Sequence, residues 1–266
     1  MVYRRPRAGV LLVCPLVVAA ACGGSSSSST TAPSTATTTP APTSSTTFQG
    51  TLAGVGASGQ SGTVTVTVAT VISAASFRPL AVSTATGSVH ITGGNTTAVS
   101  GTYDSSTNGV SVSGGGFSFT GTVNGGALSG SYSQNDVTGG FSALNTSAGS
   151  VTTYCGTYNS VKPFKDNFGR SGTYFENGNW NVQVSSNGVA TGESIPTSSG
   201  YSGPAQGPKP PAAPNFLTGQ LVGNALTLTA EGGTLTVNVN LQAGIMSGGV
   251  ESTGALSVSA SAAACQ

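Results

Sequence analysis

The sequence predicts an all-β protein, an antiparallel meander of many short strands that forms a curved sandwich or a barrel. Apolar and polar residues alternate with a period of two along much of the chain after residue 62, as in TVTVTV at 63–68, which is typical of half-buried strands. No window of a dozen residues shows a helical stripe, and only Ser73–Ala85 leaves room for a short helix or a long loop. Asn-Gly pairs supply the two positive φ angles of a tight hairpin turn. These pairs, with one Gly-Asn, occur at 108–109, 124–125, 177–178, 187–188 and 223–224.

The chain begins with the features of an export signal. Three arginines, Arg4, Arg5 and Arg7, precede the apolar stretch Ala8–Ala21, which only Pro15 interrupts. This stretch is shorter than the roughly 20 apolar residues of a membrane-spanning helix. It fits the hydrophobic region of a secretory signal that ends in small residues. We therefore expect residues 1–21 to be a signal peptide.

The end of this signal resembles the lipobox of bacterial lipoproteins. Residues 19–22 read Ala-Ala-Ala-Cys, and in that family signal peptidase cuts before a cysteine that carries a diacylglyceryl group. The family prefers Leu or Val three positions before the cysteine, where this chain has Ala19. The resemblance implies that Cys22 is the lipidated N-terminus of the mature protein, with palmitate among its acyl chains. Cys14, between Val13 and Pro15, is a poor cleavage site and is interpreted as part of the hydrophobic region. The alternative is an ordinary signal peptide in which Cys22 is incidental.

The resemblance also implies a location. The protein is expected to be exported and anchored to the bacterial cell envelope, at the outer face of the cytoplasmic membrane in a Gram-positive host. In a Gram-negative host the outer membrane is expected, because Gly23 replaces the Asp that retains many lipoproteins at the inner membrane.

A low-complexity segment follows the cysteine. Residues 23–47 are nearly all Ser, Thr, Ala and Pro, without a charge. Such a segment cannot bury enough apolar surface to offset the entropy of ordering. We expect residues 22–47 to form a disordered tether, with O-glycosylation as a further use of its hydroxyls, and residues 48–266 to form the all-β domain.

Composition limits the classes of partner. Charged residues make up 6% of the chain, against about 25% in typical soluble domains. Removal of the signal leaves five Lys and Arg against seven Asp and Glu, so the mature net charge is near −2. No basic patch favours nucleic acid or anionic lipid. The expected partners are the membrane, through the lipid, and an envelope protein or glycan; the oligomeric state stays open.

A weak repeat suggests how the sheet curves. SGTY, SGSY and CGTY contain Gly101, Gly130 and Gly156, and strand parity places each glycine between large residues on the predicted core face. Glycine there permits sharp bending and leaves room for a ring. The alternative is that glycine is simply abundant. A possible seam lies at 145–150, so one large domain or two smaller ones remain open. The whole loosely resembles the barrel domains of bacterial surface lipoproteins such as transferrin-binding proteins, at the level of fold alone.

Two cysteines, Cys155 and Cys265, remain after export. They allow one intramolecular pairing, and the compartment beyond the cytoplasmic membrane is oxidising enough for it. Parity places Cys155 on the Ser/Thr face of its strand, and Cys265 joins the serines if the last strand continues to the end. We therefore predict a disulfide on the outer face. A free or intermolecular thiol is the alternative.

Catalytic signals are sparse. His90 is the one histidine, and it shares a polar strand face with Ser88 and Thr92, as surface residues do. The sequence has no second histidine, no CxxC and no DxDxD loop, so we expect neither a metal site nor a cofactor. No enzymatic activity is expected. A hydrolase, the least favoured option, would require His90 to approach a carboxylate and a serine.

Two segments could carry a binding site. Aromatic and charged residues gather in 162–180, a mixture that suits carbohydrate or protein contacts. The alternative is that the aromatic residues face the core. The second segment, Pro196–Asn215, is rich in proline and predicted to be disordered. The candidate surface consists of Phe164, Lys165, Phe168, Arg170, Tyr174 and Trp180.

Together these features favour a lipid-anchored envelope lipoprotein with a binding or structural β-domain. A carbohydrate-binding or adhesion module on the cell surface is the alternative, and a row of exposed aromatic residues within 164–180 would favour it.

Cys22→Ser should release the protein from the membrane into the soluble fraction. Several acyl chains hold a protein stably because each buried CH₂ contributes about 0.8 kcal/mol. Membrane fractionation with labelled palmitate tests this, and Cys14→Ser is the matched control that should stay anchored. The lipid anchor would be contradicted if the Cys22→Ser protein stayed with the membrane and the wild-type protein incorporated no palmitate.

Overall fold

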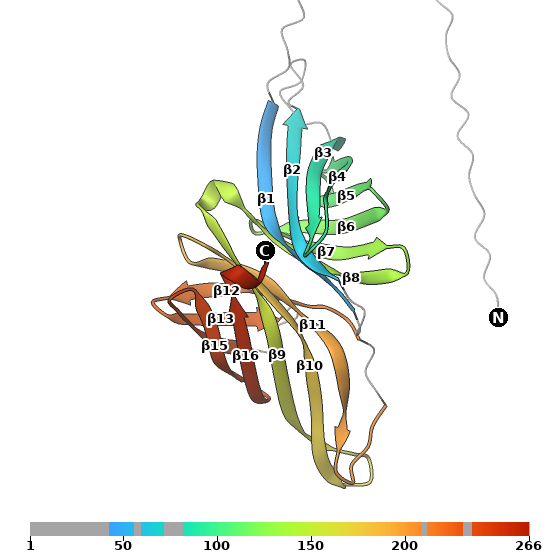
Figure 1. The fold of residues 1–266 in the computed structure, drawn as a ribbon, viewed down its shortest axis with the longest axis vertical. Helices are drawn as coiled ribbons and strands as arrows, with labels where there is room; N and C mark the ends of the chain where they lie inside the picture. Colours follow the sequence, from blue (N-terminus) through green and yellow to red (C-terminus); the bar gives the residue numbers. More distant parts are fainter. Residues whose placement is uncertain (1–42, 56–59, 72–81, 209–211, 231–235, 266) are drawn as a thin grey trace, which may run out of the picture. The chain divides into compact units, whose positions relative to one another are not determined.

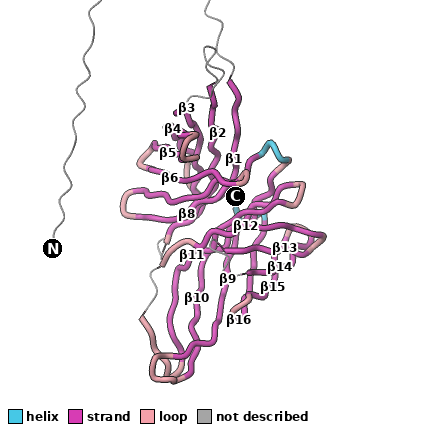
Figure 2. The backbone as a smooth tube through the Cα atoms, turned by 180° about the vertical axis from the view of Figure 1, so that it is seen from behind, coloured by secondary structure: helices cyan, strands magenta, loops and turns pink. Residues whose placement is uncertain are grey.

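The computed structural model describes residues 43–55, 60–71, 82–208, 212–230 and 236–265 (Figure 1). The described chain is all-β and antiparallel, and its strands close into two barrels of eight strands each. The predicted fold class is confirmed, with closed barrels rather than a sandwich. Strands dominate the backbone trace, and the described helices are two short 3₁₀ turns, η1 (Thr146–Ala148) and η2 (Ala262–Cys265) (Figure 2). None of the helices in this part of the chain has the length and apolar character needed to cross a membrane.

The first barrel is a meander in which each strand pairs with the next. It closes where β1 pairs with β8, so that Phe48 lies opposite Asn145 and Gly54 opposite Gly139. Its strands are β1 (Thr43–Gly54), β2 (Ser61–Val71), β3 (Val82–Ile91), β4 (Thr96–Asp104), β5 (Gly109–Gly114), β6 (Phe117–Asn124), β7 (Ala127–Gln134) and β8 (Val137–Asn145).

The second barrel repeats this plan and closes where β9 pairs with β16, with Tyr158 opposite Val258. The pairing of β9 with β16 ends at Val161, whereas β9, β10 and β11 continue to pair with one another toward the turn between β9 and β10 (Figure 1). We call this extension, residues 162–175 and 198–202, the arm. The strands are β9 (Val151–Lys165), β10 (Ser171–Ser185), β11 (Val189–Ser202), β12 (Asn215–Val222), β13 (Ala225–Ala230), β14 (Thr236–Gln242), β15 (Ile245–Glu251) and β16 (Gly254–Ser261).

Period-two alternation builds a separate core inside each barrel. In β2 the valines Val64, Val66 and Val68 are buried while the threonines between them are half-buried. Aromatic rings fill much of the first barrel, and Phe119 packs edge-on against Phe141 with their ring centroids 5.4 Å apart. The second core is mainly aliphatic, with Tyr154, Tyr158 and Trp180 among its larger members.

Glycine lies where neighbouring strands approach too closely for a side chain. A Cβ added to Gly101, Gly130 or Gly156 would lie 2.0–2.1 Å from a carbonyl oxygen of the adjacent strand. Gly121 also leaves room for the Phe141 ring, whose Cζ would be 2.7 Å from an added Cβ. The predicted glycine positions therefore lie at close strand contacts in tightly curved barrels.

Three segments can be compared with the boundaries that the sequence predicts. Residues 43–47, assigned to the tether, belong to β1 and pair with β2, because threonine is β-branched and favours strands. Most of Ser73–Ala85 lies outside the described residues, and Val82–Ala85 begins β3. The link between the barrels, with η1, lies at 146–150, where the sequence places the possible seam.

The proline-rich segment 196–215 is not disordered where the structure describes it. Pro196 lies within β11, and Ala205 is fully buried. The Tyr201 hydroxyl donates to the Pro208 carbonyl over 3.1 Å. These contacts compensate for the entropy that the segment loses on becoming ordered. Its composition alone did not indicate that such contacts would form.

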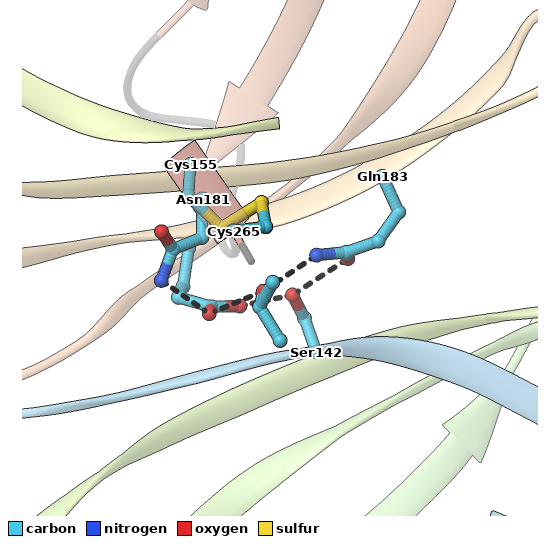
Figure 3. Close-up of a disulfide and its surroundings, with 7 residues drawn as sticks. Ser142, Cys155, Asn181, Gln183 and Cys265 are labelled. Carbon is cyan, nitrogen blue, oxygen red and sulfur yellow. Dashed lines mark hydrogen bonds between the residues drawn. A yellow bond between two sulfur atoms is a disulfide. The ribbon is translucent and has the colours of Figure 1, made fainter. Parts of the chain in front are cut away.

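The predicted disulfide between Cys155 and Cys265 is present, with Cα atoms 5.1 Å apart. Its surroundings differ from the expectation in two ways. Cys265 lies in η2 rather than in a continuing strand, and both cysteines are 7% exposed rather than open on the outer face. Cys155 pairs in register with Asn181 and Ser261, and Figure 3 shows the disulfide beside a cluster of polar side chains that includes Ser142, Asn181 and Gln183.

That cluster joins the two barrels. Thr51 and Ser142 project from β1 and β8, while Asn181, Gln183 and Glu193 project from β10 and β11, and each is at most 2% exposed. Glu193 Oε1 accepts hydrogen bonds from Thr51 Oγ1 at 2.8 Å and Asn181 Nδ2 at 3.2 Å, and Oε2 lies against Ser142 Oγ. We call these five residues the junction (Figure 3).

The junction contains one carboxyl group and no cation. Burial raises the pKa of Glu193 to about 8, and the hydrogen bonds from Ser142, Thr51 and Asn181 offset only part of this rise.

Replacing both Cys155 and Cys265 by Ser should lower the free energy of unfolding. The bond spans 110 positions, for which the chain-entropy model gives an upper figure of about 4.7 kcal/mol. Urea denaturation measures the loss, and limited proteolysis should cut near residues 250–265 before it cuts the first barrel. An unchanged midpoint and cleavage order would contradict this role.

Glu193→Gln should remove a pH dependence from stability. Between pH 4.5 and about 8 the folded state holds the Glu193 proton and the unfolded state does not. The free energy of unfolding should therefore fall as pH rises through this range, by about 1.4 kcal/mol per unit. The amide keeps the shape and a donor but cannot ionise, so this contribution should vanish. Equal pH slopes for the two proteins would show that Glu193 is charged in the folded state.

Candidate functional site

The six residues predicted as one binding surface are divided by the structure. Phe164, Tyr174 and Trp180 follow the inward parity of β9 and β10, and Trp180 is only 1% exposed within the second core. The exposed row of aromatic residues that would favour an adhesion module is therefore interrupted.

The other three gather at the turn between β9 and β10. Phe168 is 85% exposed, and the Arg170 guanidinium lies 5.4 Å from its ring centroid. Arg170 Nε also donates to Asp166 Oδ2 over 2.6 Å, and Lys165 ends β9 beside them. These residues form a charged, aromatic tip at the far end of the arm.

A different set of polar side chains meets inside the second barrel, where the arm begins. They enclose a small cavity of about 20 Å³, which we call the chamber. Its polar lining is Tyr158, Ser160, Lys162, Glu176, Trp180, Ser194, Asn215 and Glu251, and its apolar lining is Leu217, Val237 and Leu256.

Strand register explains how these side chains meet. Alternate residues of β9 point inward, so Tyr158, Ser160 and Lys162 occupy successive rows. Glu176 lies opposite Ser160, and Trp180 lies opposite Gly156, which has no side chain to occupy the space of the indole. The pairing of β9 with β10 therefore accounts for the chamber residues that these two strands contribute.

Glu251 enters the chamber because of a β-bulge. The register of β15 shifts between Gly248 and Val250, and Gly249 adopts φ 140°, which favours glycine. An extra residue reverses the faces that follow it. Val250 is accordingly 64% exposed, and Glu251 is 5% exposed.

The two carboxylates are held by hydroxyl groups and one lysine. Tyr158 donates to Glu176 Oε1 over 2.5 Å, and Tyr174 donates to Oε2 over 2.9 Å. Ser160 donates to one oxygen of Glu251 over 2.6 Å, and Lys162 Nζ lies 3.5 Å from the other. Two formal negative charges thus meet one positive charge.

Tyr158 remains a hydrogen-bond donor in this setting. Burial raises the pKa of its phenol well above the usual value of 10, and the adjacent Glu176 carboxylate raises it further. The phenol therefore stays protonated near neutral pH.

Trp180 carries an unused donor. Within the described chain its Nε1 has no hydrogen-bond partner, although the side chain is almost fully buried. A buried donor without an acceptor costs about 1–3 kcal/mol. The chamber is large enough for one water-sized group, since a water needs about 10–15 Å³. An oxygen atom held in the chamber, which Trp180 lines, would supply an acceptor for the indole.

Three further rings lie next to the chamber along the arm. Tyr174 lies opposite Lys162 on one side and Tyr201 on the other, and Phe164 lies one inward row further out. The ring centroids of Phe164 and Tyr201 are 4.6 Å apart, and those of Tyr174 and Tyr201 are 5.3 Å apart. All three side chains are half-buried, so part of each remains accessible. We call them the aromatic wall. Tyr174 connects the wall to the chamber through its bond to Glu176.

His90 lies apart from these groups. It is on β3 in the first barrel, and its Nδ1 is 3.4 Å from Thr96 Oγ1. It is not among the residues that line the chamber. Among the residues that can be described, no three His, Cys, Asp or Glu side chains gather as a metal site would need.

Lys162→Met should destabilise the protein by about 1–3 kcal/mol, because it leaves the buried Glu251 carboxylate without its cation. Lys162 is partly exposed, so the lower end is expected. Adding Glu251→Gln should restore most of the loss. Urea denaturation of the single and double variants measures the coupling, with Lys165→Met as an exposed control within about 0.5 kcal/mol of wild type. If the losses of stability in the two single variants simply add in the double variant, Lys162 and Glu251 do not interact energetically.

Comparison of the chain with models of protein families, with curated proteins and with solved structures returns no match. The function therefore has to be inferred from the chemistry of the site, because a fold by itself does not specify an activity.

Proposed function

We propose that this chain is a lipid-anchored protein of the bacterial cell envelope whose second barrel binds a small polar ligand in the chamber. The signal-like N-terminus and the lipobox-like residues 19–22 support the location. The chamber supports the binding role, and the proposal includes no catalytic step.

The observation that carries the binding role is the buried Nε1 of Trp180, which has no hydrogen-bond partner within the described chain and belongs to a residue that lines the chamber. Buried polar groups in folded proteins nearly always have partners, so an exception needs an explanation. A ligand atom that accepts from the indole supplies one. The carboxylates of Glu176 and Glu251 add convergent polar groups, as binding sites require.

A purely structural role explains the chamber less well. Replacing buried ion pairs by well-packed apolar residues is often neutral or stabilising, so charges inside a barrel add little to stability. Elsewhere the interior of the same barrel is filled by apolar side chains, with Leu226, Leu228 and Met246 fully buried in its core. The polar groups are concentrated where the arm begins, which favours recognition at that end.

The arm tip supports a second candidate, adhesion to another molecule of the envelope. Phe168 is the most exposed of the large apolar side chains in the described chain, and Arg170 and Lys165 flank it. An exposed aromatic residue with neighbouring cations is a common contact element. Loss of surface binding in Phe168→Ser with an intact chamber would favour this candidate.

Native mass spectrometry of the lipidated protein purified from its own envelope tests the primary proposal. We expect a one-to-one adduct that is lost on replacing Glu176 with Ala and retained in Phe168→Ser. Unliganded protein alone, with no change in Trp180 fluorescence on adding an envelope extract, would overturn the proposal.

A further inference from the structure

The hydrogen-bond inventory of the chamber defines the chemical group that fits it. Within the described chain, Trp180 Nε1 is a buried donor without a hydrogen-bond partner. Glu176 and Glu251 each make two recorded contacts, whereas an ionised carboxylate offers about four acceptor positions. Lys162 adds further N–H donors, since its ammonium group carries three and one is directed at Glu251. The chamber therefore presents donors together with spare acceptors, and a group that both accepts and donates matches it.

Three classes of polar group can be compared against this inventory. An ammonium group only donates, so it would leave Trp180 Nε1 unpaired. A carboxylate or phosphate only accepts, and it would add negative charge beside Glu176 and Glu251, whereas the lining contains one cation, Lys162, which pairs with Glu251. A hydroxyl accepts from the indole and donates to a carboxylate. The hydroxyl group matches both requirements and adds no charge.

The size of the chamber limits how much of the ligand can enter. About 20 Å³ holds a single hydroxyl-sized group, so the remainder must lie outside. The nearest ring of the aromatic wall, Tyr174, is one inward row beyond Glu176, roughly 7 Å away at about 3.3 Å per residue. Aromatic rings present flat apolar faces, which suit the C–H face of a sugar ring.

Building on the proposed function, we infer that the chamber binds a neutral saccharide, with one hydroxyl between Trp180 Nε1 and the carboxylates and the sugar ring against Phe164, Tyr174 and Tyr201. The wall distinguishes a saccharide from a smaller polyol, and the charge of the chamber disfavours acidic sugars.

The single tryptophan gives a specific readout. Because the chain has one Trp, a ¹⁵N-labelled protein shows one indole N–H signal, and that signal reports on the chamber. The test titrates the mature chain, residues 22–266 with Cys22→Ser, with maltotriose, cellotriose, mannotriose and chitotriose. Spermidine, glutarate and glycerol are the comparison probes. At least one trisaccharide should shift the indole signal saturably, and the comparison probes should not.

Variants locate the binding in the chamber. Trp180→Phe, followed by calorimetry, should weaken saccharide binding about fivefold, the effect of one net hydrogen bond. Glu176→Gln keeps the size of the side chain and the indole signal, and it should weaken binding similarly if Trp180→Phe fails to fold. Tyr154→Phe is the matched control, since Tyr154 is also on β9 but lines a different hollow.

The titration outcomes separate the saccharide assignment from the more general proposal that the chamber binds a ligand. A shift caused by spermidine or glutarate alone, or glycerol binding as tightly as the trisaccharides, overturns the saccharide assignment and leaves a binding function in place. No shift with any probe also overturns it, whereas the proposed function fails only if the envelope-purified protein carries no adduct. Equal affinity of wild type and both chamber variants would place any saccharide elsewhere.

Discussion

The closure of the second barrel by β9 is the constraint on which the rest of this half depends. β9 pairs with β10 on one side and with β16 on the other, so residues far apart in the chain converge on its inner face. Ser160 lies opposite both Glu176 and Leu256, and its hydroxyl donates to Glu251, 91 positions away. On the outer face the same strand carries Cys155, which fixes the chain end through η2. Without closure neither the chamber nor the disulfide would exist.

The two barrels use the same backbone solution but fill their interiors differently. Glycine on inward rows lets both curve tightly, and aromatic rings occupy the space in the first barrel, as Phe141 does beside Gly121. The second barrel carries an apolar core that changes to charged groups where the arm begins. Between the barrels, the buried carboxyl of Glu193 is tolerated because hydroxyl and amide groups surround it and its raised pKa keeps it neutral. The polar groups are thus concentrated at two defined places.

Much of the fold could be predicted from local patterns, but the site could not. Period-two alternation identified the strands, and parity already suggested that Trp180 could face the core. Glu251 was missed because a bulge reverses the faces after Gly249, and only the glycines at 248–249 hint at it. Glu193 lies on an outward face by parity, and it is buried only because β1 and β8 cover it. Closure, bulges and contacts between barrels are tertiary effects that a local period does not encode.

If the chamber holds an oxygen atom for the Trp180 indole, ordered water should occupy it in the ligand-free protein. A crystal structure at about 1.2 Å resolution would make such water visible. We expect one water within about 3.2 Å of Trp180 Nε1 that also contacts Glu176 or Glu251. An indole bonded to a protein acceptor, with a side chain filling the chamber, would show that the chamber is not a ligand site.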